Sequence, residues 1–582
     1  MLLSLLLAAS VTVQTAGELF QQAKEALDRK EPSKALSLLV PLAPESPDGA
    51  TTRALAPVYL LRGVAELALG NDAKAALNFE TAASLDPSLG AARFNLGRLR
   101  LSQRRYSEAA EEFDALVVLE PKDASAHHLL GVAYQESGRL AEARAAFERA
   151  IELHPGNVQS SYRLGTVLSA LGLHEQAASR FEQAIASGAD AVPIRNALAR
   201  ARLKSGAFND AAEQLQRIVA AGEGSASVLV DLGYCLLNTG RFEEARARFE
   251  EALILEPENH FAQFQLGTTL SKLGDREGAV RRLESSLAEP SVRAGAHNEL
   301  ARLFTASGDV DRAVEHCRLA IENAPYLVDA YYQLGRLLAR QGKTEEAQAA
   351  LARFQELSKT QEEVERFEHA TRIAPDNVGS LLELAKLYRR QGRRADALEV
   401  ASRAAQLEPD EAALQMARGE ILLEAGDLEA AEAATSKALS LAPNDPAALH
   451  LSASVLLASG NLPEAEARLR RSLEISPDSA LAWSDLGVVL SRSDSAEEAV
   501  AAFEKAIAAD AELALPRNGL GVLYSQRGEF DRAVSQFEEA VRIDPDYASA
   551  HLNLAQALRE LGREEEALRH QQAYERIEKR AK

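Results

Sequence analysis

The side chains with the greatest potential for chemistry in this sequence are few. Only two cysteines occur among 582 residues, Cys235 and Cys317, and the second directly follows His316. A cysteine and a histidine can act as nucleophile and base when their side chains face each other. Adjacent residues on a helix point about 100° apart, so this pair predicts no such site. We expect Cys317 to pack in the core, as free cysteines usually do.

Metal ligands are not grouped at a useful spacing either. The two cysteines lie 82 residues apart, and His127 and His128 have no second cluster to complete a ligand set. The glutamate runs EEF, EEA and EEEA are typical of solvated helix faces. The sequence therefore predicts no catalytic residue, no metal site and no cofactor.

Charge and length restrict the class of protein. The 65 lysines and arginines against 86 aspartates and glutamates leave a net charge of −21. This charge would repel a phosphate backbone, so we expect no nucleic-acid partner. A chain of 582 residues is too long for one core and predicts several domains or a repeat array.

A repeat of 34 residues runs through the sequence. We number each unit so that a small residue stands at position 8. An alanine follows at position 20, an aromatic residue is frequent at position 24, and a proline is frequent at position 32. The small residues are Ala23, Gly63, Gly97, Gly131, Gly165, Ala199, Gly233, Gly267, Ala301, Gly335, Ala385, Gly419, Ala453, Gly487, Gly521 and Ala555.

One unit shows the local structure that this pattern predicts. Between Ser125 and Val158 the apolar residues recur at helical spacing on both sides of Gly138, which predicts two helices. Gly131 is small where the two helices cross closely, and Phe147 fills the space beside the crossing. Because neither helix covers its own apolar face, each unit is stable only when it is stacked on its neighbours.

This pattern resembles the tetratricopeptide repeat, a 34-residue helix-turn-helix with small, alanine, aromatic and proline positions in this order. Sixteen units in register cover nearly the whole chain. The resemblance implies an all-α solenoid of tandem helix-turn-helix units that forms a superhelix. Position 24 is weaker at Cys317, Ala401 and Thr435, and we expect those units to be less tightly packed.

Two features of the sequence indicate its domain organisation, an apolar N-terminus and one long helical segment. Residues 1–16 contain an apolar run without a preceding basic residue and predict a signal peptide; the alternative is a hydrophobic first helix. One long helix between Gly342 and Pro375 is expected to divide the array into an N-terminal block, 17–358, and a C-terminal block, 359–582, that begins with the connecting helix. The alternative is an array that runs straight through with one elongated helix.

The concave surface of such a stack is lined by the first helices, and positions 5, 9, 12 and 13 lie on that side. In the resembling family this surface binds extended peptides or partner helices. Here it carries aromatic, amide and cationic side chains, which favour an acidic peptide or a terminal carboxylate. The candidate partner-binding residues are Phe94, Tyr162, Asn196, Arg200, Lys204, Phe264, Lys272, Asn298, Arg302, Tyr332, Arg336, Arg340, Lys386, Arg389 and Arg390.

These observations favour a non-enzymatic, exported scaffold that binds proteins or peptides, in an envelope or secretion assembly. The alternative function is a polysaccharide-binding or enzyme-associated module in glycan export. An exported protein, periplasmic or secreted, is expected if residues 1–16 are a signal peptide, and a cytoplasmic one otherwise. Outside residues 1–16 no apolar stretch is long enough to span a bilayer.

Overall fold

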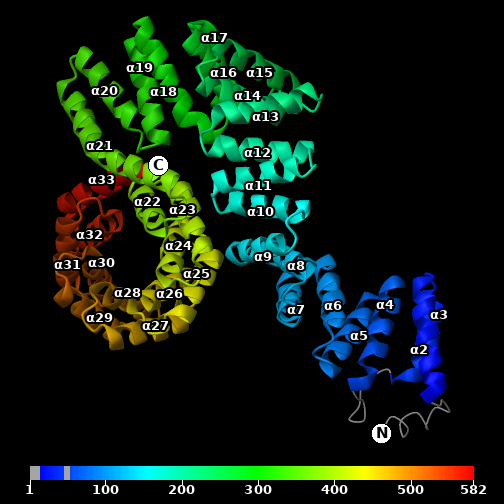
Figure 1. Cartoon of the computed structure of the whole chain (residues 1–582). Coiled ribbons are helices and arrows are strands. Elements are labelled where there is room, and N and C mark those ends of the chain that lie inside the picture. Colours follow the sequence, from blue (N-terminus) through cyan, green and yellow to red (C-terminus); the bar gives the residue numbers. More distant parts are fainter. Residues whose placement is uncertain (1–12, 45–52, 494, 582) are drawn as a thin grey trace. The chain divides into compact units, whose positions relative to one another are not determined.

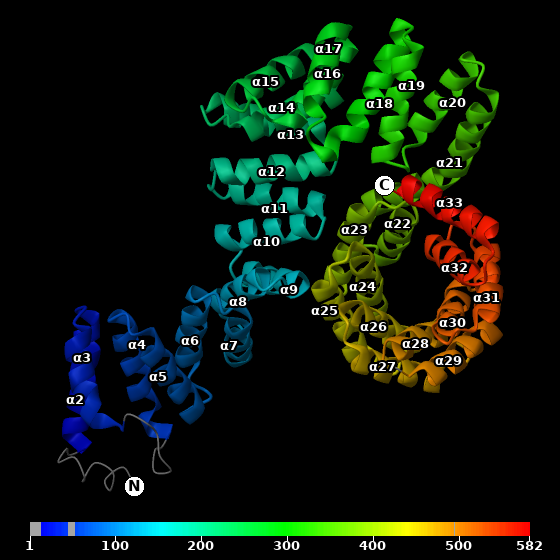
Figure 2. The same cartoon turned by 180° about the vertical axis from the view of Figure 1, so that it is seen from behind.

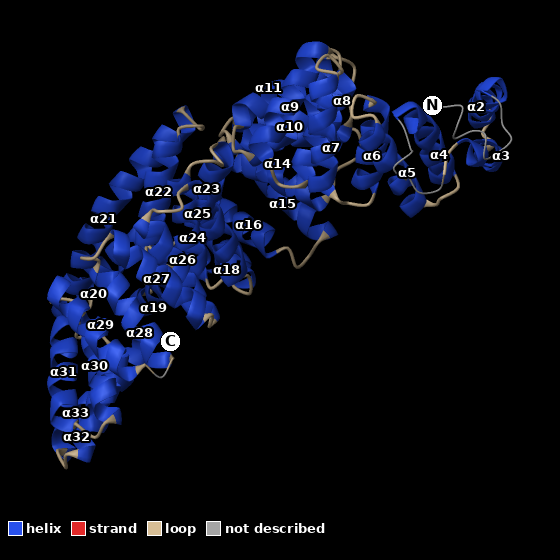
Figure 3. Cartoon of the chain, turned by 90° about the horizontal axis from the view of Figure 1, so that it is seen from below, coloured by secondary structure: helices blue, strands red, loops and turns tan. Residues whose placement is uncertain are grey.

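The computed structural model describes residues 13–44, 53–493 and 495–581, and these residues form helices and loops without a strand (Figure 3). The helices follow one another as antiparallel hairpins (Figure 1). They form two compact units, 1–376 and 377–582. The all-α solenoid expected from the repeat is confirmed.

Ten hairpins are described in unit 1. Their helices are α2 (Val13–Asp28), α3 (Pro32–Leu39), α4 (Ala56–Ala68), α5 (Asp72–Leu85), α6 (Gly90–Ser102), α7 (Tyr106–Leu119), α8 (Ala124–Glu136), α9 (Leu140–Leu153), α10 (Val158–Ala170), α11 (His174–Ala186), α12 (Val192–Lys204), α13 (Phe208–Ala220), α14 (Ala226–Asn238), α15 (Phe242–Leu255), α16 (His260–Leu273), α17 (Arg276–Ser286), α18 (Pro290–Ser307), α19 (Val310–Asn323), α20 (Val328–Arg340) and α21 (Thr344–Ile373), with short 3-10 helices η2 (Val40–Leu42) and η3 (Arg53–Leu55).

Six hairpins are described in unit 2. Their helices are α22 (Val378–Arg390), α23 (Arg394–Leu407), α24 (Ala412–Ala425), α25 (Leu428–Leu441), α26 (Pro446–Ser459), α27 (Leu462–Ile475), α28 (Ala480–Arg492), α29 (Ala496–Ala509), α30 (Ala514–Gln526), α31 (Phe530–Ile543), α32 (Ala548–Glu560) and α33 (Glu564–Ala581).

The turn inside most hairpins follows from a residue in the left-handed conformation. Gly138 ends the first helix of its unit with φ = 79°, and its N–H donates to the carbonyl of Gln135 at 3.1 Å. Glycine adopts this φ without steric cost. Arg104 and Lys30 stand at the same position of their units with φ = 60° and 61°, where an L side chain is strained.

The core lies between the two helices of each hairpin and between successive hairpins. Ala143 and Phe147 are fully buried on α9, and the ring of Phe147 lies against Gly131 on α8. The predicted close crossing at Gly131 is therefore confirmed. Cys317, Ala401 and Thr435 are also buried, and the predicted looser packing of their units stays a prediction.

The predicted long helix is present as α21, which runs for 30 residues from Thr344 to Ile373. Its first half is the partner of α20, and its second half buries Val364 and Thr371. The whole of α21 belongs to unit 1, which ends at Asp376, whereas the predicted boundary between residues 358 and 359 lies inside the helix. The compact units therefore divide after the helix, and the two predicted superhelical blocks stay a prediction.

The first helices of neighbouring units contact one another within each compact unit, whereas the second helices contact chiefly first helices. This closer spacing of the first helices bends the stack toward them. In unit 2, α24, α26, α28 and α30 lie inside the curve and α25, α27, α29 and α31 outside it (Figure 2). We call the side of the first helices the inner face.

Most of the predicted signal peptide, residues 1–12, lies outside the described residues, and α2 begins at Val13. Among the helices that are described, none combines the length and apolar character that a bilayer span requires.

Candidate functional site

Polar side chains join neighbouring first helices on the inner face. In unit 1, Gln333 Nε2 on α20 donates to Asn298 Oδ1 on α18 at 2.9 Å. In unit 2, Asn553 Nδ2 on α32 donates to Asn518 Oδ1 on α30 at 3.0 Å. Both bonds join position 6 of one unit to position 5 of the preceding one. They fix the register between first helices, so side chains at positions 9 and 13 of adjacent units form rows.

The inner face from α16 to α20 holds the most exposed aromatic candidate and four of the cationic candidates. Tyr332 on α20 is 42% exposed and packs its ring against Phe354 of α21, with ring centroids 5.2 Å apart. The Arg336 guanidinium lies over the Tyr332 ring, 5.5 Å from its centroid. Arg336 and Arg340 are exposed one helical turn apart. We define the α16–α20 face as Lys272, Asn298, Arg302, Tyr332, Arg336 and Arg340.

The cations of the α16–α20 face differ in their partners. Arg302 Nη1 lies 3.0 Å from Glu299 Oε1 on the same helix. Lys272, Arg336 and Arg340 are exposed or partly exposed and have no ion pair with any described residue. Asn298 is 9% exposed and is held by Gln333. The face therefore offers three cations without an ion pair among the described residues, one of which, Arg336, lies over an exposed ring, in a protein of net charge −21.

A second group of candidates lies on α12. Arg200 and Lys204 are both exposed, and Arg200 Nε lies 3.6 Å from Asp231 Oδ2 on α14. Burial raises the pKa of Asp231, and the two nearby cations oppose that rise. Asn196 is half-buried, and its Oδ1 has no hydrogen-bond partner among the described residues. The positive charge of α12 is thus partly neutralised by its neighbour.

The other three aromatic residues among the binding candidates are half-buried rather than exposed. Tyr162 packs on Phe181 with centroids 5.8 Å apart, and Arg98 lies over Phe94 at 5.6 Å. Phe264 on α16 lies beside Gly295 of α18, where an added Cβ would be 3.2 Å from its Cζ. These three rings contribute to packing on the inner face, and their role in binding stays a prediction.

The last three candidates stand on α22 and so belong to unit 2. Lys386 Nζ lies 2.8 Å from Glu383 Oε1, and Arg389 pairs with Glu420 and Glu424 of α24. Arg390 is exposed. These three residues fall in the predicted C-terminal block and in compact unit 2, whereas the candidates of α12 to α20 lie in unit 1, and their role in binding stays a prediction.

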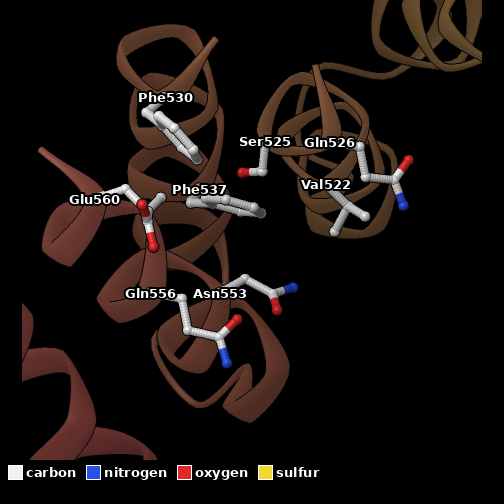
Figure 4. Close-up of a pocket in the computed structure, with 9 residues that line it drawn as sticks. Val522, Ser525, Gln526, Phe530, Phe537, Asn553, Gln556 and Glu560 are labelled. Atoms are coloured by element: carbon white, nitrogen blue, oxygen red, sulfur yellow. The ribbon is translucent and has the colours of Figure 1, made fainter. Parts of the chain in front are cut away.

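The inner face of unit 2 holds a pocket of about 500 Å³ that sequence reasoning missed (Figure 4). It lies between α30, α31 and α32, and amide side chains, one carboxylate and aromatic rings line it. Positions 9, 12 and 13 supply many of these residues, so the repeat register was a signal that could have found it. The lining residues are Val522, Ser525, Gln526, Phe530, Phe537, Asn553, Gln556, Ala557 and Glu560.

Cys317 and His316, the residues first considered for catalysis, do not face each other. Cys317 is fully buried on α19, and burial raises the pKa of its thiol to about 12, so a thiolate is disfavoured. The prediction that Cys317 packs in the core is confirmed. Its neighbour His316 turns away to meet His297, with 2.9 Å between their Nδ1 atoms. In the described parts of the chain, no three metal-ligating side chains converge.

Family comparisons agree with the helix hairpins. One tetratricopeptide repeat model matches residues 60–127, 94–158, 128–193, 162–226, 196–260, 264–327 and 382–446. Four further tetratricopeptide or TPR repeat models match residues 316–349, 422–487, 480–513 and 523–562. No curated protein matches the sequence.

Solved structures of other repeat proteins are similar to parts of the chain. MamA from Desulfovibrio magneticus RS-1 is 24% identical, with 30% of this chain and 94% of MamA covered and a TM-score of 0.27. A thermophilic TPR protein of Thermus thermophilus is 20% identical, covers 31% of this chain and 98% of its own, and has a TM-score of 0.29. A chain of the Naa15/Naa10 complex bound to HypK-THB is 14% identical over 90% of this chain and 94% of its own, with a TM-score of 0.32.

The first repeat model alone matches more than half of the residues, and the matched segments follow the 34-residue period. The chain belongs to the tetratricopeptide repeat family.

Proposed function

We propose that this protein is a non-enzymatic scaffold that binds an acidic segment of a partner protein on the α16–α20 face. The observation that carries the proposal is the exposed pair Arg336 and Arg340 on α20, unpaired among the described residues, with Arg336 over the exposed ring of Tyr332. Lys272 on α16 adds a third cation without an ion pair to the same inner face. Elsewhere on the described helices many arginines are engaged by a glutamate or an aspartate of the same or the next helix, as Arg241 is by Glu244.

The chemistry of this face fits a carboxylate-rich ligand. Guanidinium groups bind carboxylates through paired, charge-assisted hydrogen bonds, and their side chains lose little freedom when they are already held over a ring. Arg336 is held in this way by Tyr332. Arginine and tyrosine are also the residue types most often found to dominate binding energy at interfaces. Tetratricopeptide repeats are typically interaction scaffolds, which supports protein partners.

The proposed setting is an exported protein in an envelope or secretion assembly. Its support is the apolar run LLSLLLAASVTV at residues 2–13, which has the length of a secretory signal core. Fractionation of source cells, with N-terminal sequencing of the recovered protein, tests this point. A mature chain that begins near residue 17 in the exported fraction is the expected result, and full-length protein in the cytoplasm would overturn it.

The binding test compares three proteins. The parent chain, the variant Arg336→Glu/Arg340→Glu and the control Arg276→Glu/Arg281→Glu are immobilised and exposed to source-cell extract. The control makes the same change in net charge at exposed arginines of the second helix α17. We expect a partner that the parent and the control retain and the α16–α20 variant loses. Binding of the purified partner should weaken as salt rises.

Equal retention by all three proteins would contradict the proposal. In that case Tyr332→Ala distinguishes a ring-dominated contact from a site elsewhere on the chain. Circular dichroism of each variant shows whether the helices are intact, which matters most for Tyr332→Ala because that change removes the contact with Phe354.

A glycan is the second candidate ligand, and the pocket between α30, α31 and α32 is the observation that favours it. Side-chain amides and a carboxylate beside aromatic rings are groups that bind sugar hydroxyls. Asn553, Gln556 and Glu560 stand on α32 in this pocket (Figure 4). Glycan-array binding that is lost in Gln556→Ala/Glu560→Ala but kept in Arg336→Glu/Arg340→Glu would favour a glycan over a protein partner.

A further inference from the structure

Two positions of the repeat meet across each hairpin. Position 4 of the first helix and position 23 of the second helix are 19 residues apart, and the hairpin brings them side by side. Polar pairs fill these positions in several units. They are Arg93 Nη1 with Glu112 Oε2 at 3.1 Å, Arg195 Nη1 with Gln214 Oε1 at 2.8 Å, and Arg282 Nη1 with Gln263 Oε1 at 3.1 Å.

In the last unit both positions are histidines. His551 on α32 and His570 on α33 point their Nδ1 atoms at each other across 2.9 Å, with ring centroids 5.2 Å apart. His551 is 6% exposed, whereas His570 is half-buried and reaches water on one side. Sequence spacing alone did not reveal this pair, because only the repeat register brings residues 19 apart into contact.

The tautomer of His551 is fixed by its second nitrogen. Its Nε2 lies 3.0 Å from the carbonyl oxygen of Pro545, which can only accept, so Nε2 carries the proton. The Nδ1 lone pair of a neutral His551 therefore faces His570. A ring nitrogen whose partner nitrogen donates to a backbone carbonyl is the usual arrangement of a metal-binding histidine.

The separation of the two nitrogens is informative about geometry. Two ligands about 2.05 Å from one metal are about 2.9 Å apart when they subtend a right angle and about 3.3 Å apart at a tetrahedral angle. The 2.9 Å between the two atoms is the length of their hydrogen bond in the metal-free pair. It is already the separation that a right angle requires, so a metal in a square-planar or octahedral site needs little change in the distance between the two nitrogens. The His551 ring is held by its bond to Pro545, whereas the half-buried His570 ring can turn about its last side-chain torsion and direct its Nδ1 lone pair to a point in front of His551 Nδ1.

We propose that His551 and His570 form a binding site for a late first-row divalent cation, with Cu²⁺ preferred, and that water completes its coordination. Copper is favoured because imidazole suits it, its geometry is square-planar and its affinity is highest in this series. No third histidine, cysteine, aspartate or glutamate converges there among the described residues, so the other ligand positions are open.

Proton balance also permits binding at neutral pH. His570 Nδ1 donates to His551 in the metal-free pair, and its Nε2 is unprotonated. When Nδ1 takes the metal, its proton is released and Nε2 takes up one from water. The ring stays neutral throughout, so binding needs no net release of protons.

The other histidine pair has the same nitrogen separation but different surroundings. His297 and His316 lie 2.9 Å apart at Nδ1, and His316 stacks on Phe304. The Arg312 guanidinium lies 4.3 Å from the centroid of the same Phe304 ring. The charges of Arg293 and Arg312 act on this pair and are opposed by those of Glu284 and Glu315. The difference lies instead in the rings: stacking on Phe304 restricts the turn of His316, and among the described residues His297 Nε2 has no backbone carbonyl partner like the one that Pro545 provides to His551. Near His570 the charge of Arg569 is opposed by Glu566.

The test is a titration of the untagged full chain with Cu²⁺, in which calorimetry and electron paramagnetic resonance measure the binding. His551→Gln is a conservative variant, because Gln263 and Gln415 occupy the same repeat position and donate to the equivalent carbonyl at 3.1 Å. Gln214 stands at the same repeat position as His570, so His570→Gln is conservative in the same sense. His316→Gln serves as the control.

We expect one Cu²⁺ per chain with nitrogen hyperfine lines in the parent, and a loss of affinity of roughly tenfold or more in His551→Gln and in His570→Gln. The control should keep the parent's affinity. Cu²⁺ should raise the melting temperature of the parent and not that of His551→Gln. Unchanged binding in both variants, an equal loss in the control, or no stoichiometric binding by the parent would each overturn the proposal.

Discussion

The ring of Phe147 occupies the space that a side chain at Gly131 would need. A Cβ on Gly131 would lie 2.7 Å from Cδ1 of that ring, closer than two such carbons approach each other. The same relation recurs wherever glycine at position 8 faces phenylalanine at position 24, as at Gly233 with Phe249. Where position 8 is alanine, position 24 is smaller, as in Ala453 with Leu469. The glycine–phenylalanine and alanine–leucine pairs thus have similar total side-chain volumes, whereas a pair such as Ala385 with Ala401 is smaller.

Gly131→Ala should therefore destabilise the protein. Alanine is the better helix former, but the added methyl group must displace a fully buried ring, and overpacking of this kind costs about 1 to 3 kcal/mol. The double variant Gly131→Ala/Phe147→Leu reproduces the pairing of Ala453 with Leu469 and should recover part of the loss. Urea unfolding of the four proteins in this cycle measures the coupling between the two positions. Additive effects would show that the two side chains do not compete for space.

Ala245→Leu tests the alanine at position 20. Ala245 is fully buried on α15 where that helix packs on α14, so a larger side chain should cost about 1 to 3 kcal/mol in the free energy of unfolding. Ala339→Leu adds the same volume at an exposed position of α20 and should change stability little. Thermal melts of the two variants check the result, and a melt of Ala245→Leu like that of the parent would contradict the assigned register.

The turn residue Arg104 is expected to be a site of strain. Its φ is 60°, whereas glycine holds the equivalent place in most hairpins, as Gly138 does with φ = 79°. Arg104→Gly should raise the free energy of unfolding by about 1 kcal/mol, because a left-handed L residue costs that much. Gly138→Ala should lower it by a similar amount. The pair of variants is measured by chemical denaturation, and a destabilised Arg104→Gly would mean that the arginine side chain outweighs the strain.

The fold could be predicted from the sequence because residue sizes at the repeat positions reflect how the two helices of one hairpin pack together. Gly131 and Phe147 differ in size for a reason that acts within one hairpin, so their spacing along the chain predicts their contact. The candidate site was harder to predict, because exposure depends on the neighbouring helix. Phe264 and Tyr332 share position 5, yet Phe264 is half-buried beside Gly295 and Tyr332 is open. Whether a cation such as Arg389 is free to bind likewise depends on Glu420, 31 residues away on the next first helix.

The paired histidines His297 and His316 predict that stability depends on pH. Burial, together with the charges of His316 and Arg293, lowers the pKa of His297 to about 4, and burial also lowers the pKa of His316. An unfolded histidine has a pKa of about 6.5, so between pH 6.5 and 4 the unfolded chain binds more protons than the folded one. The free energy of unfolding should therefore fall as pH falls through this range, and His297 should contribute on the order of 1 to 2 kcal/mol of that loss at pH 5.

The variant His297→Gln isolates this contribution. Glutamine stands at the same repeat position in Gln263 and accepts a hydrogen bond from the residue across the hairpin, so it can accept one from His316. Urea unfolding at pH 7.5 and pH 5.0 should show a smaller loss of stability in the variant than in the parent. The groups that face the pair, Glu284, Glu315, Arg293 and Arg312, are present in both proteins, so their effect on the pH dependence is common to the two. An equal loss in both proteins would mean that His297 is protonated alike in the folded and unfolded chains, and that its hydrogen bond to His316 does not hold it neutral.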